Sequence, residues 1–221
     1  MNRRFWIFFT LILLITLAVI SAIWHNQIAA ANRAASLRNL QQWGIALTLY
    51  LMDHDSQLPE IGSAPIASTQ TRAWYNALPP YLSQKPLADV LPNEFIQSDE
   101  PSIWIDPSSK KSEKSADKEL FQYGMNRYLQ PDPTLPSFTI NELQHPSKII
   151  FLTEVASREP FATPKDIAYR RAAKPTAPNA EAFVTFADGH VASVERSRLS
   201  NSADSLRAAA ASEGKISWFK E

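Results

Sequence analysis

The stretch FWIFFTLILLITLAVISAIW, residues 5–24, decides how the rest of this chain is arranged. It contains no Asp, Glu, Lys or Arg. At ~1.5 Å rise per residue, a helix of this length crosses a hydrocarbon core of roughly 30 Å. Its hydroxyl groups, on Thr10, Thr16 and Ser21, can bond back to carbonyls of the same helix. The stretch therefore predicts a transmembrane helix, with the lipid bilayer as a partner of the chain.

The residues that flank this span predict its orientation. Arg3 and Arg4 precede it, and positive charge beside a span favours the cytoplasmic side. Trp6 and Trp24 lie at its two ends, where interfacial aromatic residues are common. We therefore expect a single-pass inner-membrane protein with residues 1–4 in the cytoplasm and the C-terminal domain in the periplasm. The alternative is a signal peptide cleaved near Ala29–Ala31, but the apolar region of a signal peptide usually has only about 7–15 residues.

The apolar span continues into a second helical segment. The first proline of the chain is Pro59, and Gly44 is the first glycine. The helical continuation carries a stripe of apolar residues at helical spacing, Leu37, Leu40, Trp43, Leu47, Tyr50 and Leu51, with Arg33, Arg38, Gln41 and Asp55 off it. We predict one helix from about residue 5 to 54, with segment 25–57 as its periplasmic continuation and residues 58–221 as a soluble, β-rich domain.

Composition restricts the class of function. Lys+Arg and Asp+Glu both total 22, so the net charge is zero and no nucleic acid partner is expected. Cysteine is absent, which excludes disulfides and thiolate metal ligands. The 16 prolines against 5 glycines predict a loop-rich domain with short elements.

Local patterns predict several elements of the soluble domain. RAWYNALPPYL (72–82) predicts a short helix that ends before Pro79, with its aromatic residues in the core. SIWIDP (102–107) predicts a short strand, and KIIFLTEV (148–155) predicts a central strand buried on both faces. The remaining predictions are an exposed charged loop at 108–119, a loop at 167–181, a short helix at 202–214, and Trp218 and Phe219 docked on the domain.

The segment TFADGHV (185–191) predicts a β-hairpin. Two strand-like runs, 182–187 and 190–194, flank Asp188 and Gly189 directly. Asp-Gly is a preferred pair for a two-residue type I′ turn, in which both positions need positive φ. That turn would place Ala187 opposite His190, Phe186 opposite Val191 and Phe183 opposite Val194. Asp188 and His190 would then be neighbours because of the turn, although their spacing also suggests a metal-ligand pair or an acid/base dyad.

Other candidates for chemistry are few. Asp53, His54 and Asp55 gather at the end of the long helix, where a metal could bind, but they lack a defined ligand spacing and also fit a solvated helix end. Glu154, at a strand end, is either a catalytic or ligand carboxylate or a loop cap. The sequence has no nucleophile elbow and no phosphate-binding glycine loop. We therefore expect no enzyme, with no catalytic, cofactor or metal residues.

Several segments resemble one protein family. FFTLILLITLAVISAI (8–23) resembles the prepilin-type N-terminus Gly-Phe-Thr-Leu-Ile-Glu-Leu-Leu, and residues 37–59 are similar to the first helix of pseudopilin-like proteins. Further matches, in the family's order, are WIDPSS (104–109), YGMNRYL (123–129), HPSKIIFLTEVAS (145–157) and FVTFADGHV (183–191). The resemblance implies a type IV pilin-like fold, in which a long N-terminal helix packs on a small antiparallel sheet with extended loops. It also implies partners among pilin-like or secretion-system subunits, and it allows calcium near Asp188.

The chain departs from the family at the positions used for processing and assembly. Prepilin peptidase cuts after a glycine, where this chain has Phe8, so that Phe9 would begin a mature subunit. The assembly glutamate of the family is Leu13 here, the histidine that precedes the Asp-Gly pair is Pro178, and a family cysteine is Asp106. A glutamate in lipid is costly without a partner, so Leu13 makes the helix a better permanent anchor.

These observations predict a membrane-anchored, pilin-like structural or assembly subunit of a type II secretion or type IV pilus-like system. The alternative is a membrane-tethered periplasmic binding or adhesion module that uses the pilin fold outside a filament, which Phe8 and Leu13 favour. A hydrolase or metalloenzyme is the third class, and the missing catalytic patterns count against it.

Overall fold

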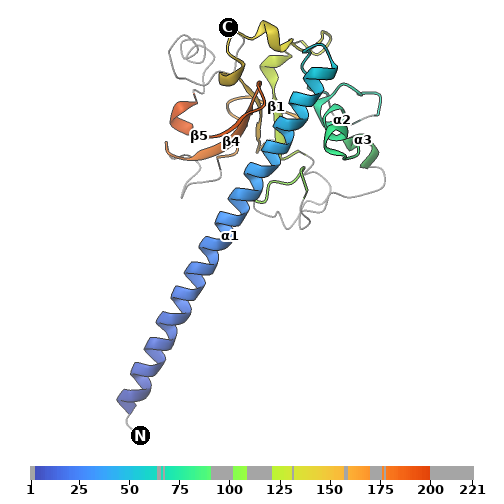
Figure 1. The fold of residues 1–221 in the computed structure, drawn as a ribbon. Coiled ribbons are helices and arrows are strands. Elements are labelled where there is room, and N and C mark those ends of the chain that lie inside the picture. The colour runs from blue at the N-terminus through green and yellow to red at the C-terminus, as the bar shows by residue number, and fades with distance from the viewer. Residues whose placement is uncertain are drawn as a thin grey trace.

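The molecule consists of a long helical stalk and a head built on the far half of the same helix (Figure 1). The computed structural model describes residues 3–63, 66, 68–90, 102–108, 121–130, 132–156, 159–169, 176 and 178–199, with side chains in the long helix from Phe8 onward. We use "stalk" for residues 8–31, all of which are exposed, and "head" for the described residues from 32 onward. The fold class is α+β, as predicted.

Helix α1 (Arg3–Asp53) confirms the single uninterrupted helix expected from the sequence. It ends where the backbone becomes left-handed at Asp55 and Ser56, with φ of 50° and 64°. The Ser56 N–H donates to the Leu51 carbonyl at 3.0 Å, which closes the last turn of the helix. Pro59 follows this turn, so the helical hydrogen-bond pattern cannot continue beyond it.

The second half of α1 is the central core element of the head. Leu40, Trp43 and Leu47 are fully buried, and Tyr50 is 1% exposed, as the apolar stripe predicted. The ring of Trp43 makes edge contacts with Trp74 at 5.4 Å and with Trp104 at 5.0 Å between centroids. Burial of these large rings fixes α1 within the head.

A five-stranded sheet packs on this half of α1, in the order β3-β1-β2-β4-β5. Its strands are β1 (Tyr123–Asn126), β2 (Ile150–Glu154), β3 (Phe161–Ala162), β4 (Glu181–Phe186) and β5 (Val191–Glu195). The β1–β3 pair is parallel and the other pairs are antiparallel, so the sheet is mixed rather than antiparallel throughout as expected. Strand β2 is central and every residue in it is buried, which confirms the buried strand predicted within 148–155. One face of the sheet meets α1, where Thr185 donates its hydroxyl to the Leu40 carbonyl at 3.1 Å.

The predicted strand at 102–107 is wrong, because this segment forms a turn. The Ile105 N–H donates to the Ser102 carbonyl at 3.3 Å within the turn. Side chains of α1 hold it in place: Asn39 Nδ2 donates to the carbonyls of Ser102 and Ile105 at 2.9 and 2.8 Å, and Trp43 Nε1 donates to that of Ile103 at 3.1 Å. Backbone groups that a strand would offer to a neighbouring strand are therefore bonded to the helix.

Short helices complete the described part of the head. Helix α2 (Trp74–Ala77) confirms the short helix predicted to end before Pro79, and η1 (Pro79–Leu82), which was not predicted, follows it. Trp74, Tyr75 and Leu78 are fully buried there. The others are α3 (Leu87–Val90), η2 (Arg127–Leu129), η3 (Ile140–Glu142), η4 (Pro146–Lys148) and η5 (Arg196–Arg198). Residues 109–119 of the loop predicted at 108–119, residues 170–175 and 177 of the loop predicted at 167–181, the helix predicted at 202–214, and Trp218 and Phe219 lie outside the described residues.

Candidate functional site

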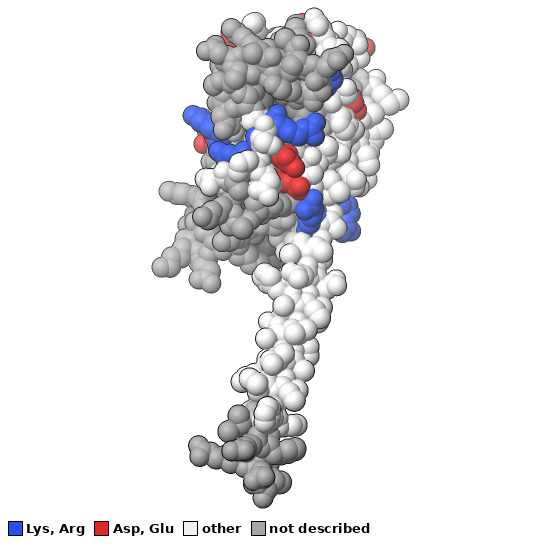
Figure 2. Space-filling view, turned by 90° about the vertical axis from the view of Figure 1, so that its left-hand side faces the viewer, with Lys and Arg blue, Asp and Glu red and all other residues white. Residues whose placement is uncertain are grey.

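The stalk is exposed and mainly apolar up to Trp24, and the polar run His25–Asn26–Gln27 follows. Among the described residues, α1 is the one helix long and apolar enough to cross a membrane, and no part of its most apolar segment is buried. No charged residue occurs from Phe5 to Asn32, and in Figure 2 the blue of Lys and Arg first appears where the stalk meets the head. There Arg33 pairs with Glu181 at 2.7 Å, so the first charge beyond the apolar surface ties the helix to strand β4.

The three stalk residues that the resemblance singles out are all exposed. Phe8, Phe9 and Leu13 keep 66%, 53% and 49% of their surface accessible, so they face whatever surrounds the stalk and not the head. The Leu13 carbonyl accepts the hydroxyl of Thr16 at 2.8 Å, the kind of local bond that makes a hydroxyl tolerable in lipid. The surface at position 13 is therefore purely apolar.

The hairpin between β4 and β5 exists, but its predicted register is wrong by one residue. Thr185 lies opposite Val191, Val184 opposite Ala192 and Phe183 opposite Ser193. The Phe186 N–H donates to the His190 carbonyl at 2.8 Å, and the Gly189 N–H donates to the Phe186 carbonyl at 2.9 Å. The loop thus contains three residues, with left-handed backbone at Gly189 (φ 88°) but not at Asp188, which excludes the type I′ turn.

This shift exchanges the two faces of β5. Val194 packs with Phe186 and Val184 on the face of the sheet away from α1, and Val191 packs on the core that includes Phe183. The sequence-based register had placed Val191 with Phe186 and Val194 with Phe183. A one-residue slip moves every side chain of a strand to the opposite face, and the buried core selects the observed register.

Asp188 and His190 form a local pair at the tip of this hairpin. The His190 Nδ1 atom and the Asp188 Oδ1 atom are 2.6 Å apart, and the same oxygen accepts the His190 N–H at 3.2 Å. The imidazole also stacks on Phe186, with ring centroids 4.2 Å apart. The described residues contain no group of three or more His, Cys, Asp or Glu side chains able to hold a metal ion. The pair therefore orders the turn.

The sequence did not reveal that the hairpin tip rests on α1 through two glycines. A Cβ added at Gly44 would lie 2.1 Å from the Gly189 carbonyl oxygen, and one added at Gly189 would lie 2.6 Å from Thr48 Oγ1 and 2.9 Å from the Gly44 oxygen. Backbone therefore touches backbone at this point, and neither residue has room for a side chain. A glycine inside a helix otherwise costs stability, so Gly44 was the available signal.

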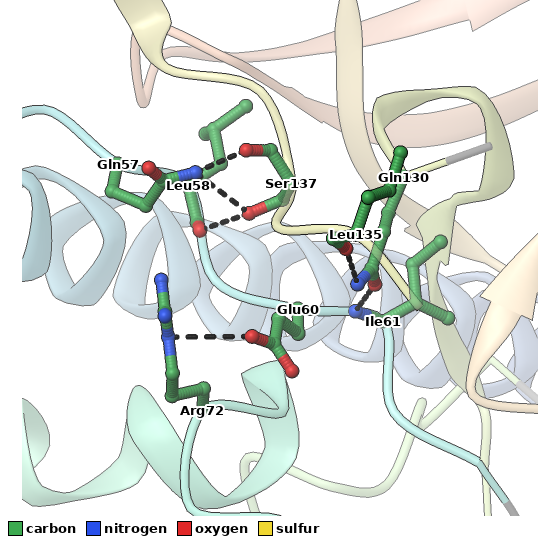
Figure 3. Close-up of polar contacts among 8 residues, drawn as sticks. All are labelled: Gln57, Leu58, Glu60, Ile61, Arg72, Gln130, Leu135 and Ser137. Atoms are coloured by element: carbon green, nitrogen blue, oxygen red, sulfur yellow. Dashed lines mark hydrogen bonds and ion pairs between the residues drawn. The ribbon is translucent and has the colours of Figure 1, made fainter. Parts of the chain in front are cut away.

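Polar contacts fix the chain where it leaves α1 (Figure 3). Ser137 donates its hydroxyl to the Leu58 carbonyl, and Gln57 Nε2 donates to the Ser137 carbonyl. Further along, the Ile61 N–H donates to Gln130 Oε1 at 2.8 Å. The Glu60–Arg72 pair at 3.3 Å holds the other side of the same segment.

The Asp-His-Asp cluster at the end of α1 is divided among separate contacts. Asp53 accepts the Tyr81 hydroxyl at 3.0 Å. His54 stacks on Tyr50 with centroids 3.9 Å apart, and its Nδ1 atom lies 3.0 Å from the Tyr50 carbonyl. Asp55 adopts the left-handed backbone of the helix end. These contacts are those of a helix terminus.

Two buried carboxylates hold the head together. Asp106, 1% exposed, accepts the hydroxyl of Ser36 on α1 at 2.5 Å and the N–H of Ser108 at 2.9 Å. Glu154 is fully buried and accepts the Phe183 N–H of the adjacent strand at 3.0 Å. Each therefore bonds a neighbouring element, and Glu154 lies inside the sheet rather than in an open site.

The chain matches no protein-family model, no curated protein and no solved structure.

Replacing Gly189 with Val should lower the free energy of unfolding by about 2 kcal/mol or more, because the new side chain meets α1 and disfavours the left-handed backbone. The measurement is urea unfolding of the full chain in detergent. Asp188→Ala is the control, and its expected loss is below about 1 kcal/mol because Asp188 is not left-handed. An equal loss of stability in both variants would contradict the three-residue loop and support the type I′ turn instead.

Replacing Gly44 with Ala should also destabilise the protein, by about 1–3 kcal/mol, because the methyl group would overlap the Gly189 carbonyl. The sign is informative, since Gly→Ala in an unobstructed helix stabilises by about 0.5–1 kcal/mol. Thermal unfolding of Gly44→Ala beside Gln41→Ala, an exposed position of the same helix, distinguishes the two outcomes. A gain in stability at position 44 would contradict the contact with the hairpin.

Proposed function

We propose that this chain is a membrane-anchored, pilin-like structural or assembly subunit of a type II secretion or type IV pilus-like system. The observation that supports this most is the double role of α1, whose first half is an exposed apolar stalk and whose second half is the core of the head. An enzyme that is only tethered needs no such continuity. A subunit that transmits position or force from the membrane to its head needs this continuity.

The dimensions of α1 fit this role. At ~1.5 Å per residue the helix is about 75 Å long, and its exposed stalk alone is long enough for a bilayer core of roughly 30 Å. Ser36 is the first fully buried residue among the described side chains of the helix, little more than a turn beyond the stalk. The head is thus held close to the membrane surface at a fixed height and angle.

The proposed topology places the N-terminus in the cytoplasm and the head in the periplasm. Arg3 and Arg4 support it, since basic residues beside a span remain on the cytoplasmic side. The proposed role is structural and not catalytic. In this role the Asp188–His190 pair orders the tip of the hairpin that rests on α1. The proposed partners are the bilayer and other pilin-like or secretion-system subunits.

The second candidate is a membrane-tethered periplasmic module that does not enter a filament. Phe8 and Leu13 favour it, because an apolar residue at position 13 offers no charge for pairing with a neighbouring subunit. The two candidates predict different locations for the same chain.

Fractionation of cells that produce the chain tests the proposal. We expect the subunit in sheared surface material, or in complexes with secretion components, as well as in the membrane. Mass spectrometry should find the peptide that spans Phe8 and Phe9 intact in the wild type, whereas the double variant Phe8→Gly, Leu13→Glu should be cut after position 8. Recovery solely as an isolated membrane protein would support the tethered module, and a wild-type chain that begins at Phe9 would contradict the unprocessed anchor.

A further inference from the structure

Helix α1 carries a second apolar surface within the head, on the side opposite its buried stripe. Ile45, Leu49 and Met52 are 50%, 39% and 76% exposed. Spacings of four and three residues place them on one face of the helix. We call these three residues the outer stripe. Contiguous exposed apolar side chains, unlike single scattered ones, are the kind of surface that binds a partner.

We propose that the outer stripe packs against the outer stripe of a second copy of this chain, parallel and in register. The inference rests on the membrane anchorage proposed above but not on the filament role, since a filament subunit and a tethered module could both form this pair.

Anchoring by the stalk favours a second copy over other occupants. Two chains whose stalks occupy the same bilayer point in the same direction, and their outer stripes lie at the same height above the membrane. Confinement to one surface removes much of the translational and rotational freedom that association normally costs. A soluble partner has no such advantage and would need a larger contact.

The spacing of the outer stripe also fits a parallel pair of helices. Apolar residues that alternate four and three apart form the seam of a two-helix coiled coil. Met52 and Ile45 are seven residues apart, as the heptad repeat of a coiled coil requires. The equivalent positions one and two heptads before Ile45 are Arg38, which is exposed, and Ala31 at the end of the stalk. Two copies in register would bring two Arg38 side chains together, so the pairing is interrupted at Arg38 and resumes in the apolar stalk.

The small size of the outer stripe makes the pairing conditional on the membrane. Stable interfaces between soluble proteins bury about 1,200–2,000 Å² in total, far more than three side chains on each copy can supply. The outer stripe therefore acts together with the stalks, where close packing of the two helices adds to the contact area. We expect a reversible pair in the bilayer.

Single-cysteine cross-linking in membranes tests this, because the natural chain has no cysteine. The variants Leu49→Cys and Met52→Cys, as full chains under mild oxidation, should form homodimeric disulfides, which need Cα atoms roughly 4.4–6.8 Å apart. Thr48→Cys is the matched control: it is exposed on the same helix but lies beside Gly44 and the hairpin tip. We expect the yield at positions 49 and 52 to be at least about fivefold higher than at 48, because disulfides form only within that short distance.

Two further variants test the role of charge and of the apolar side chains. With Met52→Cys as the reporter, Arg38→Gln should raise the disulfide yield about twofold or more, because the repulsion between like charges is removed. Leu49→Gln in the same background should lower the yield by at least about half, because it weakens the apolar contact.

Four results would overturn the pairing. The first is an equal disulfide yield at positions 48, 49 and 52. The second is a preferential disulfide between Leu49→Cys and a cysteine at a different height in a second tagged copy, such as Ala31→Cys, and the third is a disulfide with another protein. The fourth is protection of Leu49→Cys from maleimide in the monomer, which would mean that the chain itself covers the outer stripe. Absence from sheared surface material would contradict the filament role without affecting the homodisulfide, so the two proposals fail separately.

Discussion

Continuity of helix α1 from the apolar stalk into the core of the head is the constraint on which the rest of the structure depends. Leu40, Trp43 and Leu47 are fully buried on the same uninterrupted helix whose first half is exposed and uncharged. Any rotation of the head relative to the stalk would have to break this helix or expose its tryptophan core. Whatever holds the stalk therefore also sets the orientation of the sheet and of the loops around it.

The irregular segments of the head depend on the same helix through side-chain bonds to backbone. Asn39 and Trp43 hold three carbonyls of the turn at 102–105, and Ser36 bonds Asp106 just beyond it. Backbone groups in a proline-rich chain cannot all be satisfied by regular helices and strands, so they need other partners when they are buried. Polar residues of α1 provide those partners at the edge of its buried stripe, which explains how a loop-rich domain keeps a defined core.

The elements that could be predicted from sequence are those set by local periodicity. The continuous apolar pattern up to Tyr50 predicted α1, and the apolar run at 148–155 predicted the central strand β2. The hairpin was predicted but its register was not, because Asp188-Gly189 satisfies a local preference for a two-residue turn that the contact between Gly189 and Gly44 overrides. Residues 102–107 likewise have the composition of a strand, and only the distant side chains of Asn39 and Trp43 make them a turn. What could not be predicted was set by contacts between segments far apart in the chain.

The apolar surface of the stalk limits how copies of this chain can recognise one another. A carboxylate at position 13 would be costly in lipid until it met a positive partner, and that cost would make association strong and specific. With Leu13 the isolated helix is already stable in the bilayer, and contacts between stalks depend on close packing alone, which distinguishes registers poorly. Specific recognition must then come from the parts of α1 beyond the apolar stalk, where solvent makes apolar burial favourable and charged side chains can distinguish partners. Arg38 and the exposed residues beyond it lie there, on the part of the helix that follows the apolar stalk. An uncharged stalk thus leaves the selection of a partner to the head.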